Sequence, residues 1–162
     1  MRVEVIDIEQ TKNEAKKFML KKIPLLSKVF QFNNVISDMK LEYIEFKVLT
    51  YEVISSKKNH RIFKHDVKKE TITILVNTYD GQSESIDKLP NTLNKYISKS
   101  SIKQSKIDEN DLVNVVKEQV INRLSDRLRY EYINKIKIID IKSIYKPYWI
   151  AYFRGRHIFI DY

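Results

Sequence analysis

The sequence predicts an α+β fold built from two tandem units, each a helix followed by antiparallel strands, with cores that are shared or abut. Three observations predict it. The chain repeats itself at a constant offset, each copy passes from a helical to a strand-like hydrophobic pattern, and the size suits one domain or two small halves. The chain has 162 residues, of which 43% are hydrophobic, so we expect a folded protein.

The repeat is clearest when residues 36–52, ISDMKLEYIEFKVLTYE, are placed over residues 138–154, IIDIKSIYKPYWIAYFR. Four positions are identical, and Phe46 falls on Tyr148. Further along, TILVN at 73–77 resembles HIFID at 157–161. We therefore expect residues 12–79 and 110–162 to superpose.

The elements follow in order. A strand is expected at residues 3–8, and a first helix follows, which Pro24 kinks or ends. The aromatic and aliphatic alternation of 36–52 predicts a strand, and Asp80-Gly81 marks a turn after the next one. A second helix is predicted by apolar residues at every fourth position: Leu112, Val116, Val120, Leu124 and Leu128.

These elements predict three regions. Residues 1–87 form the first unit, with the N-terminal strand and a basic insertion at 55–70. Residues 88–107 form a polar linker, and residues 108–162 form the second unit.

The YKPYW stretch at 145–149, and the apolar strands TILVN and HIFID ending in Asn or Asp, resemble tandem PepSY and cystatin-like small domains. The resemblance implies a cystatin/PepSY-like fold and a role in binding or inhibition rather than catalysis. The chain departs from that pattern because no glycine turn follows the second copy.

Composition excludes several classes of function. Gly81 and Gly155 are the two glycines, so a glycine-rich phosphate loop or a dinucleotide fingerprint is absent. Cysteine is absent, which excludes disulfides and thiolate metal sites. The beginning MRVEVIDIEQ lacks an apolar leader and no run is long enough to span a membrane, so we expect a cytoplasmic protein. A soluble fragment of an exported protein stays open.

The residues that could support catalysis have structural explanations. His60, His65 and His157 lack the ligand spacing of a metal site. The carboxylates at 108–111 suit the start of a helix, and those of Asp80 and Glu84 suit a turn and a solvent-facing strand. We therefore expect no catalytic residue, no metal, no cofactor and no enzymatic activity.

The formal net charge of +9 favours anionic partners, although the charges are spread along the chain. The basic insertion contains Ile62 and Phe63, which would suit contacts with bases or lipid. The alternative is a solvated hairpin whose lysines protect a sheet edge. The candidate surface for an anionic partner consists of Lys57, Lys58, Arg61, Lys64, Lys68 and Lys69.

A second candidate cluster is aromatic. Aromatic residues on strands belong more often to a core or a subunit interface than to a ligand site. The cluster consists of Tyr145, Tyr148, Trp149, Tyr152 and Phe153.

The sequence thus predicts a non-enzymatic binding or interaction module, whose partner is another protein or a second copy of the chain. One alternative is a nucleic-acid-binding protein that uses residues 57–69. Another is a small ligand-binding protein or hydrolase with a pocket between the two halves.

Overall fold

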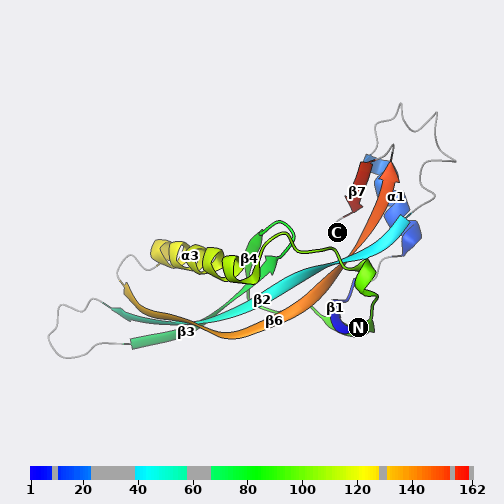
Figure 1. Ribbon diagram of the computed structural model, residues 1–162. Helices are drawn as coiled ribbons and strands as arrows, with labels where there is room; N and C mark the ends of the chain where they lie inside the picture. Colours follow the sequence, from blue (N-terminus) through cyan, green and yellow to red (C-terminus); the bar gives the residue numbers. More distant parts are fainter. Residues whose placement is uncertain (9–10, 23–38, 58–66, 128–130, 154–155, 161–162) are drawn as a thin grey trace. The chain divides into compact units, whose positions relative to one another are not determined.

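A computed structural model describes residues 1–8, 11–22, 39–57, 67–127, 131–153 and 156–160 (Figure 1). The helices in this part of the chain are α1 (Lys12–Lys22), α3 (Glu109–Arg127) and the short 3-10 helix η1 (Lys99–Ser101). The strands are β1 (Arg2–Ile6), β2 (Met39–Lys57), β3 (Val67–Asn77), β4 (Ser83–Ile86), β5 (Thr92–Tyr96), β6 (Glu131–Phe153) and β7 (Arg156–Ile160).

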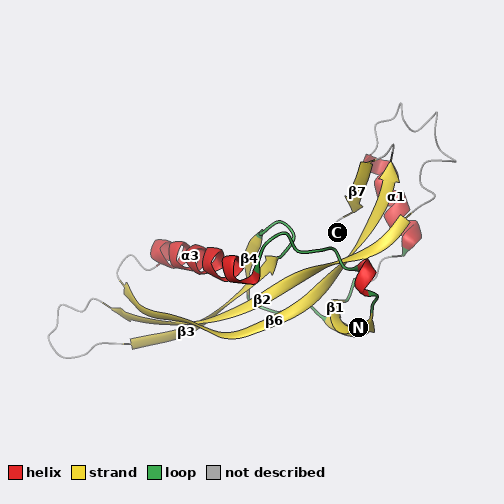
Figure 2. Cartoon of the chain, viewed as in Figure 1, coloured by secondary structure: helices red, strands yellow, loops and turns green. Residues whose placement is uncertain are grey.

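The described strands form a mixed sheet in the order β4-β3-β2-β6-β1-β5, and β7 pairs with β6 (Figure 2). Strand β1 runs parallel to β6, where Val5 is the partner of Tyr145. The pairs β1–β5, β2–β3, β3–β4 and β6–β7 are antiparallel.

The predicted fold class of two tandem, cystatin/PepSY-like helix-plus-strand units is therefore wrong. Strands dominate the described structure, and β2 from the first repeat lies beside β6 from the second in one mixed sheet. The physical reason is the length of these strands, 19 and 23 residues. Strands in globular proteins usually have about 3–10 residues. Strands β2 and β6 are longer, and each contributes residues to both compact units, so the two copies do not form separate units.

The chain divides into two compact units, and each is discontinuous in sequence. Unit 1 consists of Met1–Ile44, Asn91–Lys103 and Tyr145–Tyr162, and unit 2 consists of Glu45–Pro90 and Gln104–Ile144. Strands β2 and β6 contribute residues to both. The order helix, strand, strand does recur as α1-β2-β3 and α3-β6-β7, while superposition of the two copies stays a prediction.

Two small apolar clusters are formed by the described residues of unit 1. In one, Val3 and Val5 of β1 pack with Ile97 and Tyr145. In the other, Ala15 of α1 packs with Met39 and Ala151, against which Phe18 and Trp149 also lie. The N-terminal strand predicted at residues 3–8 is thus present as β1, and it is buried at alternate positions as strand geometry requires.

Unit 2 has the larger cluster, formed where α3 lies across the sheet (Figures 1 and 2). The apolar stripe of the helix packs on β2 and β3, as its spacing of four residues predicts. The described members of the stripe, Leu112, Val116, Val120 and Leu124, are each 3% exposed or less. The second predicted helix is therefore confirmed, and it covers one face of the unit 2 sheet.

Candidate binding surface

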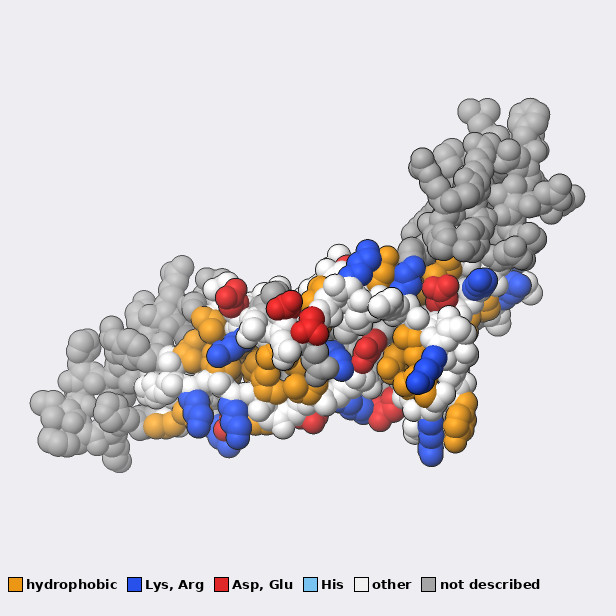
Figure 3. Space-filling model, viewed as in Figure 1, with side chains coloured by type: hydrophobic (Ala, Val, Ile, Leu, Met, Phe, Trp, Pro, Cys, Tyr) orange, Lys and Arg blue, Asp and Glu red, His pale blue; other side chains and the backbone are white. Residues whose placement is uncertain are grey.

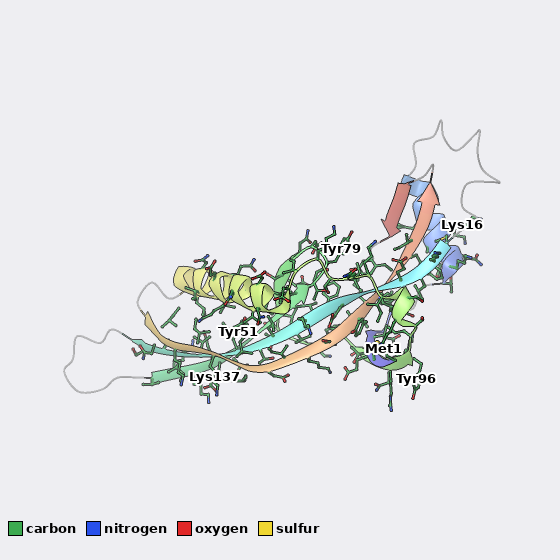
Figure 4. The ribbon with its side chains drawn as sticks, in the orientation of Figure 1. Met1, Lys16, Tyr51, Tyr79, Tyr96 and Lys137 are labelled. Atoms are coloured by element: carbon green, nitrogen blue, oxygen red, sulfur yellow. The ribbon has the colours of Figure 1, made fainter. Side chains whose placement is uncertain are left out.

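The other face of the unit 2 sheet carries charged and polar side chains. Leu49, Tyr51 and Val53 on β2 belong to the cluster with α3. Because side chains alternate along a strand, Glu52 lies on the face away from the helix. Tyr51 points from β2 toward α3 in Figure 4, and its hydroxyl donates a hydrogen bond to the carbonyl oxygen of Val113 at 3.5 Å.

Glu52 is the carboxylate at the centre of this surface. Lys69 Nζ, from β3, lies 2.6 Å from Glu52 Oε2. The side chain of Lys69 is 65% exposed and that of Glu52 is 22% exposed, so this ion pair borders solvent. The hydrogen bond from Lys69, helped by the charges of Lys69, Lys137 and Lys135, holds the pKa of Glu52 below its usual range, against a smaller opposing effect of burial.

Lys135 and Lys137 come from β6. Along this strand Ile136 and Ile138 pack against the cluster under α3, while Lys135 and Lys137 are exposed. Figure 4 shows Lys137 on the side of the sheet away from α3. We call the surface formed by Lys69, Lys135, Lys137 and Glu52 the lysine face. Its three ammonium groups and one carboxylate give it a net charge of +2.

Neutral groups adjoin the lysine face. Thr50 pairs with Thr73, and Thr71 pairs with Glu52 across β2 and β3. Residues paired in this way share a face of the sheet, so these threonines lie beside the charges. Further along β6, Ile139 and Ile141 are 48% and 43% exposed. In Figure 3 basic side chains lie along the lower edge of the view, with some carboxylates among them.

The structure separates the two described lysines of the basic insertion. Lys68 and Lys69 are consecutive on β3, so their side chains leave opposite faces of the sheet. Lys69 belongs to the lysine face, whereas Lys68 Nζ lies 3.2 Å from Glu70 Oε2 on the other face. Lys57 ends β2, but its side chain lies outside the described residues, as do Lys58, Arg61 and Lys64.

The described aromatic candidates lie in the interior of unit 1. Tyr145 is 8% exposed, and Tyr148 is 5% exposed with Lys146 Nζ 5.1 Å from its ring centroid. Trp149 is partly buried against Ala15, Met39 and Ala151. Tyr152 and Phe153 belong to β6, and their side chains lie outside the described residues.

Other candidates from the sequence occupy structural positions. The Asp108 carbonyl oxygen accepts a hydrogen bond from the Leu112 amide at 3.0 Å, at the start of α3. Asp80 Oδ1 accepts one from the Gln82 amide at 3.0 Å, in the turn after β3. Within the described part of the chain, no three acidic, histidine or cysteine side chains gather as a metal site would require. His60 and His65 lie outside this part, as does the side chain of His157.

Sequence reasoning missed Lys135, Lys137 and Glu52. The signal was the stretch Lys135-Ile136-Lys137-Ile138, in which basic and apolar residues alternate with the period of a strand. That alternation predicts a strand with one basic and one buried face. It does not predict that β2 and β3 add Glu52 and Lys69 to the same face, because this depends on strand order.

Comparisons with protein-family models, with curated proteins and with solved structures found no match for this chain. The resemblance to PepSY and cystatin-like domains stays a prediction. None of the described helices combines the length and the apolar character that crossing a membrane would need.

Proposed function

We propose that this protein is a non-enzymatic binding module that holds an anionic macromolecule on the lysine face of unit 2. The proposal keeps the function class expected from the sequence. The candidate surface is now the lysine face and no longer the basic insertion at residues 57–69. Lys69 belongs to both surfaces.

One observation carries the proposal. Lys69, Lys135 and Lys137 come from two different strands and lie around a single carboxylate, Glu52. Lysines can protect a sheet edge, and the stretch of β6 with Lys135 and Lys137 has β2 on one side and no second neighbour among the described pairings, because β1 pairs at Tyr145 and β7 at residues 149–153. Edge protection requires no cluster, however, whereas these lysines gather with Lys69 from β3 around one carboxylate on one face of the sheet. A sheet face with excess positive charge is suited to attracting a polyanion.

Binding to labelled polyanions tests the proposal. The probes are a short DNA duplex, a single-stranded RNA and poly-L-glutamate, each followed by fluorescence anisotropy at several salt concentrations. We expect at least one of them to bind, and we expect its affinity to fall as salt rises. The double variant Lys135→Gln/Lys137→Gln should weaken that binding at unchanged thermal stability, since exposed lysines contribute little to folding.

The matched control is Lys95→Gln/Lys99→Gln, which removes two exposed lysines of unit 1. It changes the net charge by the same amount, so a general charge effect would weaken binding equally in both variants. Equal losses, or no binding of any probe tighter than about 100 μM, would contradict the proposal.

A protein partner, and specifically a second copy of the chain, is the second candidate, and it concerns unit 1. Strand β5 stands last in the order of the described strands, so one of its edges is unpaired there. Its Tyr96 is 83% exposed and its Leu93 is 46% exposed. Two such edges could pair antiparallel across a twofold axis. Light scattering would show a dimer that Tyr96→Glu dissociates, and a monomeric wild type would contradict this candidate.

The proposal also keeps the expected location in the cytoplasm. Fractionation of cells that express the tagged protein would test it, and recovery from the membrane or the medium would contradict it.

A further inference from the structure

We infer that the anionic macromolecule is a nucleic acid, held by its phosphate backbone on the lysine face without preference for base sequence. This inference rests on the proposed function and narrows it to one class of partner. The alternatives, an acidic protein and an anionic lipid surface, are outcomes of the test.

The identity of the cations is the first argument. All three basic groups of the lysine face are lysines. Lysine meets phosphate as a mobile point charge, and it is depleted at interfaces between proteins, where arginine and aromatic residues are enriched. The composition of the face therefore favours phosphate over the surface of an acidic protein.

The neutral neighbours are the second argument. Thr50, Thr71 and Thr73 share the face with the lysines. Threonine hydroxyls are common donors to phosphate and sugar oxygens in complexes with nucleic acid. A lipid surface would use exposed apolar side chains. Ile54, which pairs with Lys69 on this face, is half-buried, and the exposed Ile139 and Ile141 follow the lysines along β6 and do not surround them. Hydroxyl and ammonium donors side by side thus suit a chain of phosphates.

Spacing is the third argument. Residues two apart on a strand are separated by about 6.8 Å. Successive phosphates of one DNA strand are further apart than the axial rise of about 3.4 Å, because the backbone also winds around the helix axis. The spacing of Lys135 and Lys137 on β6 therefore suits successive phosphates. Strand β2 separates β6 from β3, so Lys69 lies about 9–10 Å across the sheet from that pair. The lysines can contact phosphates along and beside one strand of the nucleic acid.

The same residues explain why base sequence should not matter. The sequence of a duplex is read from base edges inside the grooves, which admit an α-helix or a two-stranded ribbon. The lysine face is one face of a sheet in which β2 lies between β3 and β6, so its side chains meet the phosphate backbone and not the base edges. Contacts to phosphates fix the position of a nucleic acid and carry no sequence information directly.

The test compares two duplexes of unrelated sequence with poly-L-glutamate and with vesicles that contain phosphatidylserine. We expect both duplexes to bind with the same affinity, within twofold, and more tightly than the other two probes. The slope of log K against log salt should fall in magnitude by about 1.8 in Lys135→Gln/Lys137→Gln, because each lost phosphate contact removes about 0.9.

Glu52→Gln supplies the opposite perturbation. It removes the carboxylate that binds Lys69, so affinity for duplex DNA should rise by about two- to fivefold, the range of an exposed charge interaction. A Glu52→Gln variant that failed to fold would lose affinity for DNA, so a gain in affinity reports on the lysine face and not on folding. The Lys95→Gln/Lys99→Gln variant again serves as the control for net charge.

The outcomes separate the inference from the proposed function. If poly-L-glutamate binds through Lys135 and Lys137 while the duplexes do not, the inference is overturned and the binding function stands. If only the vesicles bind, the partner is a lipid surface, and both the inference and the proposed function are overturned. If the duplexes bind but differ more than tenfold in affinity, sequence-independent backbone binding is overturned. If none of the probes binds, both fail.

Discussion

At the scale of single residues, Gly81 is required by the turn between β3 and β4. Its φ is +76°, and a Cβ at this position would lie 2.6 Å from Ile107 Cδ1. Its amide donates to the Asn77 carbonyl oxygen at 2.8 Å. Side chains other than that of glycine are strained in this backbone region and would also clash here.

We therefore expect Gly81→Ala to lower the free energy of unfolding by about 1–3 kcal/mol, as measured by urea denaturation. Gln82→Ala is the control, because the Gln82 side chain is exposed and the substitution keeps the backbone amide that donates to Asp80. An alanine variant as stable as wild type would show that this turn adopts another conformation. The turn itself was predictable, because Asp80-Gly81 is a local signal.

Tyr51 makes stability depend on alkaline pH. Burial raises the pKa of its phenol from 10.0 to about 12. A group whose pKa is raised in the folded state contributes stability that is complete below its unfolded pKa and is lost as pH rises through the folded pKa. Wild type should therefore lose stability from pH 10 to about 12.

The Tyr51→Phe variant should lose less stability across that range, because phenylalanine has no ionisable hydroxyl. Chemical denaturation of both proteins at a series of pH values measures the difference. Parallel curves for wild type and Tyr51→Phe would mean that Tyr51 does not cause the dependence. Sequence alone gave no sign of this effect, since it depends on α3 covering β2.

At the scale of elements, α1 begins with a capping box. The Glu14 amide donates to Thr11 Oγ1 at 3.3 Å, and Glu14 Oε2 accepts from the Thr11 amide at 2.9 Å. The backbone and side-chain hydrogen bonds from Thr11 lower the pKa of Glu14. A lowered pKa means that this contribution to stability is present above the unfolded pKa and is lost as pH falls.

Thr11→Ala should therefore cost about 1 kcal/mol of stability, and Thr11→Ser should cost much less, because serine keeps the hydroxyl. Urea denaturation at neutral pH measures both, and circular dichroism follows the helix. Equal losses in the two variants would show that the hydroxyl does not cap α1.

The elements also show where sequence reasoning succeeds and fails. The stripe of α3 was predictable because i, i+4 spacing is local, and Leu112, Val116 and Val120 are buried as expected. Strand β6 was harder to predict. Residues 139–141 are all exposed, and residues 144 and 145 are both buried. A single alternation of buried and exposed side chains therefore does not describe its 23 residues. The lysine face was missed for the related reason that it combines three strands.

At the scale of the whole molecule, the internal repeat led to the wrong fold class. Helix, strand, strand recurs in the chain, and this order was correctly predicted from the pattern. Strand pairing, however, joins residues far apart in sequence, and periodicity does not specify the neighbour of a strand. Phe46 pairs with Asn77 within the first copy, but β2 also lies beside β6 of the second. The copies therefore contribute strands to one mixed sheet, in place of the two tandem helix-plus-strand units with shared or abutting cores that the repeat predicted.

The central claim is that the lysine face, rather than net charge in general, holds the partner. Lys68 and Lys69 provide the most direct test, since they are adjacent in sequence and their side chains leave opposite faces of β3. Each is changed to glutamine, and the affinity for duplex DNA is measured by anisotropy at low and physiological salt. The account predicts that Lys69→Gln weakens binding and lowers the salt slope by about 0.9, while Lys68→Gln leaves both unchanged. Equal effects of the two variants, or a larger effect of Lys68→Gln, would contradict it.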